Sequence, residues 1–315
     1  MKNFVKRKSM QKPKVIVIVG PTASGKTKMS IELARRINGE IVCADSMQVY
    51  KDMNIGTAKV TKEEADGIKH YLIDMVFPNE RYTVSDFKKD SENAIEEILL
   101  NGKTPIVVGG TGLYINSLIY GIEYQEMNFD IQYRNELIKK AGTETGLMEL
   151  YNEAMKIDNE AMKIISPNDK KRIIRVLEIY KATGHTKTEQ EILSRKNGVK
   201  YDFKVYGITM DREKLYERIN KRVDIMILNG LIEEVEELKT KYNEFPTAMQ
   251  GLGYKEIMEY LNGNLLKEEM IEKIKQETRR YAKRQLTWFR KNKEIMWLNS
   301  EDEMEENIAR MENTI

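Results

Sequence analysis

The chain has 315 residues, of which 41% are hydrophobic and 32% are charged, and its formal net charge is +2. This balance is typical of two folded domains, or of one large domain with an insertion, and it excludes disordered and collagen-like classes. One cysteine and two histidines exclude a disulfide scaffold and leave little room for histidine or multi-cysteine metal chemistry. No apolar run approaches the roughly 20 residues that cross a bilayer, and residues 1–14 are basic without the apolar stretch of a signal peptide. We therefore expect a cytoplasmic protein.

Short apolar runs, most of them rich in β-branched residues, predict the strands of a parallel sheet. The predicted strands cover residues 14–19, 40–44, 69–75, 104–108, 201–209 and 295–298. Helical patterns separate these runs. Predicted helices start near residue 26, cover residues 84–101, lie between residues 211 and 242, and extend from about residue 267 to residue 293. An acidic helix follows the last predicted strand. Strands that alternate with helices indicate an α/β fold with a parallel sheet flanked by helices.

The pattern changes in the middle of the chain. Residues 130–195 show helical periodicity and no convincing strand. The simplest organisation is an α/β core made of residues 1–121 and 200–315, with an all-helical domain inserted at residues 122–199.

The first chemical motif is a glycine-rich loop between a predicted strand and a predicted helix. Its sequence GPTASGKT satisfies the phosphate-loop pattern in full, with the residues Gly20, Pro21, Thr22, Ala23, Ser24, Gly25, Lys26 and Thr27. The backbone N–H groups of such a loop converge on phosphate oxygens at a helix N-terminus. Lys26 is expected to reach the terminal phosphate oxygens, and the Thr27 hydroxyl is expected to hold Mg²⁺. The motif indicates a polyphosphate ligand, and leaves the reaction open.

Two further polar segments follow predicted strands. DSMQVY begins at Asp45, and GGTGLY contains Thr111. Loops at the carboxyl ends of parallel strands meet at the ligand-binding edge of such sheets, so both segments are expected to face the phosphate loop. Asp45 could bind Mg²⁺, act as a general base, or cap a helix with help from Ser46. Asp74 competes for the metal-binding role on the same logic.

Charge is unevenly distributed near the C-terminus. Nine Lys or Arg residues and one Glu lie between Lys273 and Lys293, and six acids and one Arg lie between Glu301 and Glu312. The basic stripe is a candidate surface for an anionic partner such as nucleic acid, and the alternative is a solvated helix face. Trp288 and Phe289 lie within the stripe, and we expect them to pack into the core.

Six segments together resemble the bacterial type of the tRNA dimethylallyltransferase (tRNA isopentenyltransferase) family. They are GPTASGKT, DSMQVYKDMNIGTAK, GGTGLY, ISPNDKKRIIRVLEIYKATG, QGLGYKE and TRRYAKRQLTWFRK, and they span nearly the whole chain. The resemblance implies a phosphate-loop core with an inserted helical domain that binds tRNA. It implies transfer of a dimethylallyl group from dimethylallyl diphosphate, with Mg²⁺, to the exocyclic amine of the adenosine just 3′ of the anticodon in tRNAs that read codons beginning with U. One departure is the QGLGYKE segment, which often reads QAIGYKE in the family.

The resemblance also implies roles for individual residues. Asp45 takes the amine proton, Thr111 positions the acceptor side of the channel, and Arg222 contacts the diphosphate. Arg218 lies four residues before Arg222, so both share one face of a predicted helix. The tRNA contacts implied by the family are Asp45, Ser46, Met47, Gln48, Thr111, Arg134, Lys171, Arg172, Arg175, Gln250, Gly253, Tyr254 and Lys255.

Alternative functions remain open at this stage. The phosphate loop also fits a phosphotransferase or NTPase that uses NTP. For a prenyltransferase, the sequence leaves open whether the loop binds a nucleotide in addition to diphosphate. An isopentenyltransferase acting on free adenine nucleotides is the nearest rival, and a non-catalytic RNA-binding protein would leave the phosphate loop without a role. Nothing in the sequence demands more than a monomer.

Overall fold

The computed structural model describes residues 12–124 and 130–314, so the basic segment before residue 12 lies outside the described residues. The chain forms two compact units. The core unit comprises the residues up to Ile119 and from Lys200 onward, and the helical unit comprises Tyr120–Val199. The helical unit thus begins two residues before the expected insertion at 122–199. No helix within the described residues is long and apolar enough to cross a membrane.

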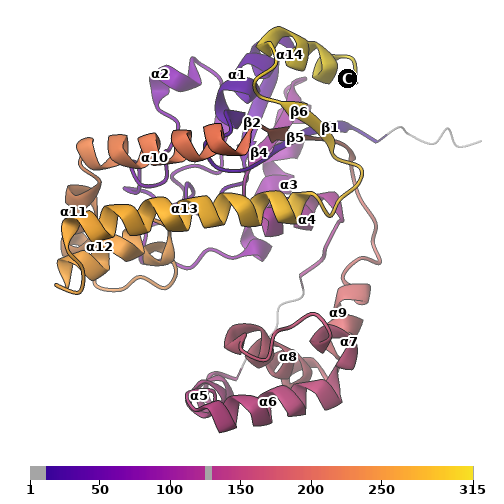
Figure 1. The fold of residues 1–315 in the computed structure, drawn as a ribbon. Helices are drawn as coiled ribbons and strands as arrows, with labels where there is room; N and C mark the ends of the chain where they lie inside the picture. The colour runs from indigo at the N-terminus through magenta and orange to yellow at the C-terminus, as the bar shows by residue number, and fades with distance from the viewer. Residues whose placement is uncertain (1–11, 125–129, 315) are drawn as a thin grey trace, which may run out of the picture. The chain divides into compact units, whose positions relative to one another are not determined.

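A six-stranded parallel sheet organises the core unit (Figure 1). Its order is β3-β2-β4-β1-β5-β6. The strands are β1 (Lys14–Val19), β2 (Gly39–Cys43), β3 (His70–Tyr71), β4 (Thr104–Gly109), β5 (Asp202–Thr209) and β6 (Met296–Asn299). β1 lies centrally, and Val17 pairs with Val107 on one side and with Val205 on the other. The predicted fold class is confirmed, since the sheet is parallel throughout and helices flank it.

The alternating side chains of the strands build two cores, one on each face of the sheet. Val15, Val17 and Val19 pack with α3 (Val84–Leu100) and α4 (Gly112–Ile119). Ile16 and Ile18 point to the other face and pack with α1 (Lys26–Arg36) and α14 (Met304–Glu312). Burial on both faces explains why these strands read as continuous apolar runs in the sequence.

One predicted strand is much shorter than expected. The run 69–75 contributes only the two residues of β3. Leu72 and Asp74 both have positive φ angles, of 64° and 54°. A strand requires extended backbone at every position, so the ladder ends before Leu72. The length predicted for this strand was wrong.

Helices that follow β5 form a third core over the segment after β2. They are α10 (Arg212–Leu228), α11 (Leu231–Lys241), η1 (Ala248–Gln250), α12 (Tyr254–Leu261) and α13 (Lys267–Phe289). The short α2 (Lys62–Ala65) belongs to the connection between β2 and β3. Val49, Tyr50 and Met53 are buried against α11, α12 and α13. The long α10 and α13 run side by side (Figure 1). The segment after β2 is therefore anchored by side chains from distant parts of the chain.

The helical unit contains α5 (Ile131–Lys140), α6 (Glu144–Ile157), α7 (Asn159–Met162), α8 (Lys170–Thr183) and α9 (Lys187–Leu193). Leu150, Ile173 and Leu177 are among the residues of its own buried core. α8 starts where Asp169 accepts a hydrogen bond from the backbone N–H of Arg172, and ends at Gly184 with φ of 71°. As predicted, the described residues of this unit form helices and no strand.

Candidate active site

A pocket of about 990 Å³ lies at the carboxyl ends of β1, β2 and β4. Its lining includes the phosphate loop and α1, residues between Cys43 and Glu64, the end of β4 with Gly110, and residues of α10, α13 and α14. The carboxyl edge of a parallel sheet is where α/β folds bind their ligands. The pocket therefore joins segments that are far apart in the sequence.

The phosphate loop leaves β1 and leads into α1. Gly20 has a φ of 152°, and a Cβ there would lie 2.7 Å from the Ile208 carbonyl oxygen. Gly25 caps α1 with a φ of 92° and offers no side chain to the first N–H groups of the helix. The Ser24 hydroxyl is buried and has no hydrogen-bond partner. A buried orphan hydroxyl beside an uncapped helix N-terminus suits an anionic ligand.

Lys26 lies inside the pocket with its ammonium held near the loop. Its Nζ donates a hydrogen bond to the Pro21 carbonyl oxygen at 2.7 Å. Burial lowers the pKa of Lys26 to about 8, with the Asp45 carboxylate opposing this shift and the Arg222 guanidinium adding to it. Thr27 is exposed and also lines the pocket. A bound anion would restore the ordinary high pKa of the ammonium.

Asp45 follows β2 along the chain and lines the same pocket as the phosphate loop. Burial raises the pKa of Asp45, while the backbone N–H of Met47, which donates to its Oδ1 at 2.9 Å, and the Lys26 charge lower it. Residues 46–49 form a turn and no helix, so helix capping by Asp45 is wrong. Asp74 pairs with Lys59 and is not among the pocket-lining residues. Of the two competing aspartates, only Asp45 faces the pocket.

Thr111 connects its own loop to the segment that carries Asp45. Its Oγ1 accepts a hydrogen bond from the Ser46 N–H at 3.0 Å and donates to the Ser46 Oγ at 3.3 Å. The backbone N–H of Thr111 donates to the Ala44 carbonyl oxygen at 3.3 Å. The predicted neighbourhood of Asp45, Ser46 and Thr111 thus exists in the structure.

Two arginines of α10 add positive charge to the pocket. Arg218 and Arg222 both line it, as their spacing predicts. Burial lowers the pKa of Arg222, and the neighbouring Arg218 charge lowers it further. Neither guanidinium forms an ion pair with any described residue. The Glu64 carboxylate, which also lines the pocket, partly opposes these shifts of the Arg222 pKa, and two neighbouring cations favour an anion between or beside them.

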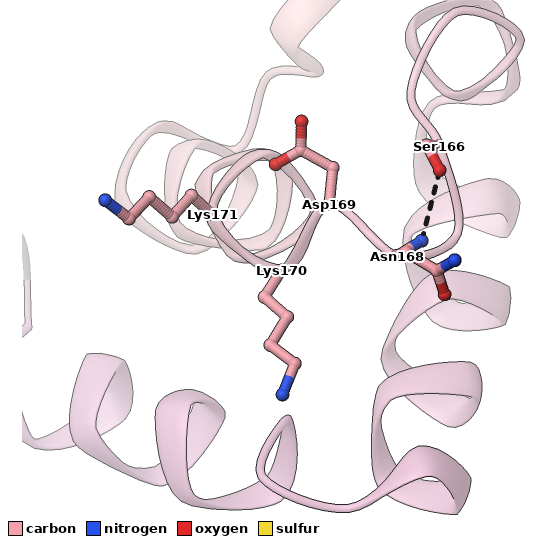
Figure 2. Close-up of a pocket in the computed structure, with 5 residues that line it drawn as sticks. All are labelled: Ser166, Asn168, Asp169, Lys170 and Lys171. Atoms are coloured by element: carbon pink, nitrogen blue, oxygen red, sulfur yellow. Dashed lines mark hydrogen bonds between the residues drawn. The ribbon is translucent and has the colours of Figure 1, made fainter. Parts of the chain in front are cut away.

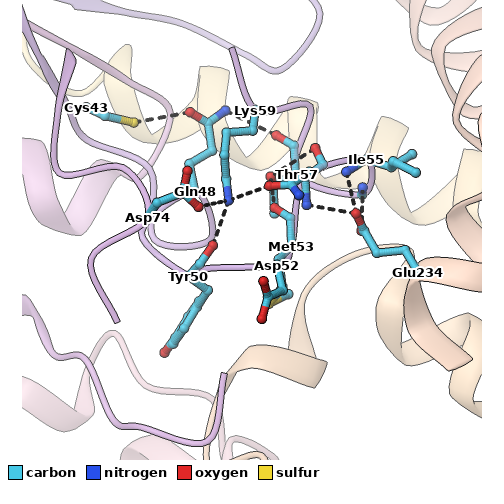
Figure 3. Close-up of polar contacts among 12 residues, drawn as sticks. Cys43, Gln48, Tyr50, Asp52, Met53, Ile55, Thr57, Lys59, Asp74 and Glu234 are labelled. Atoms are coloured by element: carbon cyan, nitrogen blue, oxygen red, sulfur yellow. Dashed lines mark hydrogen bonds and ion pairs between the residues drawn. The ribbon is translucent and has the colours of Figure 1, made fainter. Parts of the chain in front are cut away.

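The segment after Asp45 is held by a buried carboxylate from α11 (Figure 3). The Glu234 side chain, 8% exposed, accepts N–H bonds from Asn54 at 2.8 Å, Ile55 at 2.7 Å and Gly56 at 3.1 Å. It also accepts the Tyr254 hydroxyl at 2.6 Å. A carboxylate with four donors is fully compensated for its burial.

Lys59 and Gln48 complete this network (Figure 3). The buried Lys59 ammonium donates to the Tyr50 carbonyl oxygen at 2.7 Å and to the Asn54 Oδ1 at 2.9 Å. The Gln48 oxygen accepts the Cys43 thiol at 3.3 Å, and its amide nitrogen donates to the Thr57 carbonyl oxygen at 3.1 Å. Together with Glu234, these side chains fix the course of residues 45–59, which we call the acceptor loop.

The expected tRNA contacts differ in exposure. Tyr254 is 1% exposed with its hydroxyl on Glu234, so a direct contact between its ring and RNA is contradicted by its position. Gly253 is also buried, with a φ of 90°. Gln250 and Lys255 are exposed, and Met47 lies half-buried in the acceptor loop.

The other expected contacts lie in the helical unit. Lys171, Arg172 and Arg175 are exposed on α8, and Arg134 donates to the Glu178 carboxylate at 2.8 Å. A shallow pocket of about 460 Å³ at the start of α8 is lined by Ser166, Asn168, Asp169, Lys170 and Lys171 (Figure 2). The two lysines extend to different sides of the helix (Figure 2). A surface of this kind can neutralise phosphates at several points.

The sequence analysis missed two residues of α13 that line the main pocket. Tyr281 and Gln285 lie one turn apart, and their spacing on a predicted helix was the available signal. The prediction for the aromatic pair was half right. Phe289 is 2% exposed and packs in the core, whereas Trp288 is 37% exposed and its ring covers Gly112, where a Cβ would lie 2.3 Å away. Core packing was therefore wrong for Trp288.

Comparisons with known proteins agree with one another. The family model described as IPP transferase matches residues 48–292. A tRNA dimethylallyltransferase of Acetivibrio thermocellus is 53% identical over 289 residues, covering 91% of this chain and 92% of the relative. One from Caldanaerobacter subterraneus is 48% identical over 303 residues, covering 93% and 96%.

Solved structures are similar as well. The tRNA isopentenylpyrophosphate transferase of Bacillus halodurans has a TM-score of 0.72 and 42% identity, covering 96% of this chain and 95% of that one. A eukaryotic dimethylallyltransferase acting on tRNA has a TM-score of 0.75 and 34% identity, covering 92% and 74%. The family model and these relatives span most of the chain, and the chain belongs to the IPP transferase family.

Proposed function

We propose that the protein transfers a dimethylallyl group from dimethylallyl diphosphate to the exocyclic amine of the adenosine just 3′ of the anticodon, in tRNAs that read codons beginning with U. The relatives described above are named for this transferase activity. One observation carries the proposal for this chain. A phosphate loop and the half-buried carboxylate of Asp45 line the same pocket, so a diphosphate leaving group and a proton acceptor can face one substrate carbon.

The reaction requires an activated electrophile. The lone pair of an adenine amine is delocalised into the ring, so the amine is a poor nucleophile. The bond between C1 of the dimethylallyl group and the diphosphate oxygen breaks as the bond between C1 and the amine nitrogen forms. The departing diphosphate gathers negative charge, which is proposed to be stabilised by the loop N–H groups, Lys26 and Arg222, all of which line the pocket.

Asp45 is the proposed proton acceptor. The amine nitrogen becomes more acidic as it gains a fourth bond, and an ionised carboxylate beside it then takes the proton. Asp45 lines the pocket, and its raised pKa makes it a stronger base than an exposed aspartate. Thr111 positions the acceptor side through its bonds to Ser46. The proton thus ends on Asp45 and the electron pair of the broken bond ends on diphosphate.

The residues present fit Mg²⁺ as a cofactor. The Thr27 hydroxyl supplies an oxygen ligand in the pocket, which is the donor type that Mg²⁺ prefers, while Asp45 is left to take the proton. Residues 12–124 and 130–314 hold no group of three acidic, histidine or cysteine side chains arranged for a metal. A cation here would therefore take its other ligands from diphosphate and water, and it would supply further charge stabilisation to the leaving group.

The acceptor is proposed to be tRNA, with the protein acting as a monomer in the cytoplasm. The exposed base of an anticodon loop can leave its stack and enter a pocket. Exposed Lys171, Arg172 and Arg175 on α8, and Lys283 and Arg290 on or beside α13, offer cations for phosphates. Phosphate contacts of this kind fix the position of the RNA on the protein. Ser46, Met47 and Gln48 are proposed to contact the base.

A transfer assay tests the proposal. The protein is mixed with radiolabelled dimethylallyl diphosphate, Mg²⁺ and unmodified tRNA, and a parallel reaction contains free AMP instead. We expect labelled adenosine from the tRNA alone. Label in AMP alone would assign the protein to free nucleotides. Binding of tRNA should also weaken steeply between 15 and 150 mM salt (roughly tenfold or more), because contacts to phosphates release counterions.

A further inference from the structure

Gln285 occupies a position that the proposed chemistry does not yet use. It lies on α13, is 5% exposed, and lines the main pocket. Its Oε1 accepts the Thr22 N–H at 2.8 Å, and its Nε2 donates to the Gly110 carbonyl oxygen at 2.9 Å. One side-chain amide therefore joins two loops that follow different strands.

The two joined loops serve opposite sides of the proposed reaction. Thr22 belongs to the phosphate loop. Gly110 directly precedes Thr111, whose hydroxyl holds Ser46 next to Asp45. A Cβ on Gly110 would lie 2.2 Å from the Gln285 Nε2, so the close approach of the amide also explains the glycine. The chain of bonds from Thr22 through Gln285 and Thr111 thus ends beside the carboxylate.

The Gln285 amide satisfies both partners. The Thr22 N–H needs an acceptor and the Gly110 carbonyl needs a donor, and an amide provides one of each on two atoms bonded to the same carbon. An ionised carboxylate accepts but cannot donate, and an apolar side chain does neither. Because the side chain is buried, water does not readily replace a lost bond.

We propose that Gln285 is a positioning residue that fixes the distance between the phosphate loop and the Asp45–Thr111 side of the pocket. The inference rests on the proposed transfer reaction, in which the first loop holds the leaving group and the second side holds the acceptor amine. Attack requires these two groups to be aligned closely, and a displacement of about 1 Å can slow such a step about a hundredfold.

Two substitutions test this role. Gln285→Met keeps the length of the side chain and removes both bonds. Gln285→Glu keeps the acceptor for Thr22 and, when protonated, regains the donor for Gly110. Thr287→Ala is the matched control, because Thr287 is exposed on the same helix two residues away and its hydroxyl donates to the Lys283 carbonyl oxygen of its own helix.

The first measurement is single-turnover transfer to tRNA at saturating substrates, with the folded fraction checked by thermal unfolding. We expect Gln285→Met to lower the rate about tenfold to a hundredfold and the control to keep the wild-type rate. Wild-type protein that transfers no label contradicts the proposed function. Wild-type protein that transfers label while Gln285→Met keeps at least half of the rate contradicts the role of Gln285.

The second measurement is the pH profile of Gln285→Glu. Burial raises the pKa of a carboxyl group, so lowering the pH from 8.5 to 6 should protonate Glu at this position and restore the donor. Titration of Asp45 affects both proteins alike, so it cancels in the ratio of the variant rate to the wild-type rate. This ratio should therefore rise as the pH falls, because the introduced carboxyl gains its proton. A ratio that stays flat, with both proteins folded, overturns the proposed role, since a purely steric role depends on no proton.

Discussion

The phosphate loop and the acceptor loop face one pocket but are built in opposite ways. The phosphate loop offers groups that await a ligand: an orphan Ser24 hydroxyl, an uncapped helix start and a Lys26 ammonium whose hydrogen bond within the described residues goes to the Pro21 carbonyl oxygen. The acceptor loop has its polar groups already engaged by Glu234, Lys59 and Gln48. The polar groups of the phosphate loop await an anion, whereas those of the acceptor loop already have partners within the protein.

This difference follows from what each loop must recognise. A diphosphate carries charge that can organise a flexible set of N–H donors around itself. A neutral base edge supplies little energy for ordering a loop, so the contacts to it must be held in place beforehand. Substitutions that alter one loop at a time therefore distinguish effects on ligand binding from effects on the positioning of the acceptor loop.

The largest effect is expected for Asp45→Asn. This variant keeps the size of the side chain and removes the base, so turnover should fall by roughly 10²–10⁴. Affinity for Mg²⁺-diphosphate, measured by calorimetry, should stay within about threefold. In the wild type, activity should fall at low pH as protons bind to the raised-pKa carboxyl of Asp45. Equal losses of turnover and diphosphate affinity would instead make Asp45 a metal ligand.

A smaller loss is expected for Lys26→Met in the other loop. Removing one charge-assisted contact to phosphate should weaken diphosphate binding by roughly tenfold to a hundredfold. Binding of tRNA alone should be unaffected. Lys89→Met is a suitable control, because Lys89 is an exposed lysine of α3 that does not line the pocket. A comparable effect in the control would mean that only general charge matters.

Glu234→Gln should disturb the acceptor loop without touching a ligand. An amide offers one acceptor oxygen to the N–H groups of Asn54, Ile55 and Gly56, so some donors lose their partner. The free energy of unfolding should fall by about 1–3 kcal/mol, as measured by urea denaturation. Glu233→Gln alters the adjacent exposed acid and should leave stability within about 0.5 kcal/mol. Equal effects of the two substitutions would contradict the role of Glu234 in holding the acceptor loop.

The smallest effect concerns protons. Burial lowers the pKa of Lys26 to about 8, so the free protein carries a partly neutral amine above that pH. Diphosphate favours the ammonium and raises the pKa, so binding between about pH 8 and 10 should take up a fraction of a proton. Calorimetry in buffers of different ionisation enthalpy measures this uptake. Uptake that persists in Lys26→Met would assign it to another group.

Local sequence patterns predict the elements whose structure depends on local features. The buried strands, the phosphate loop and the shared face of Arg218 and Arg222 all follow from spacing along the chain. Strand β3 is short because Leu72 and Asp74 turn the backbone, which an apolar run does not reveal.

Features that depend on distant partners were not predictable in this way. Tyr254 is buried because Glu234 receives its hydroxyl, and Gln285 matters because Thr22 and Gly110 lie on either side of it. Trp288 is partly exposed, and its ring lies against Gly112 of α4. Each of these pairings joins residues from separate elements, and no periodicity along one element encodes it.

The central claim is that the phosphate loop holds a leaving group. The most direct test measures diphosphate release and adenosine alkylation in one reaction containing tRNA, dimethylallyl diphosphate and Mg²⁺, with a parallel reaction containing ATP. We predict one diphosphate released for each alkylated adenosine, both lost in Asp45→Asn, and no phosphate released from ATP. Phosphate release from ATP that depends on Lys26, without alkylation of tRNA, would contradict the account.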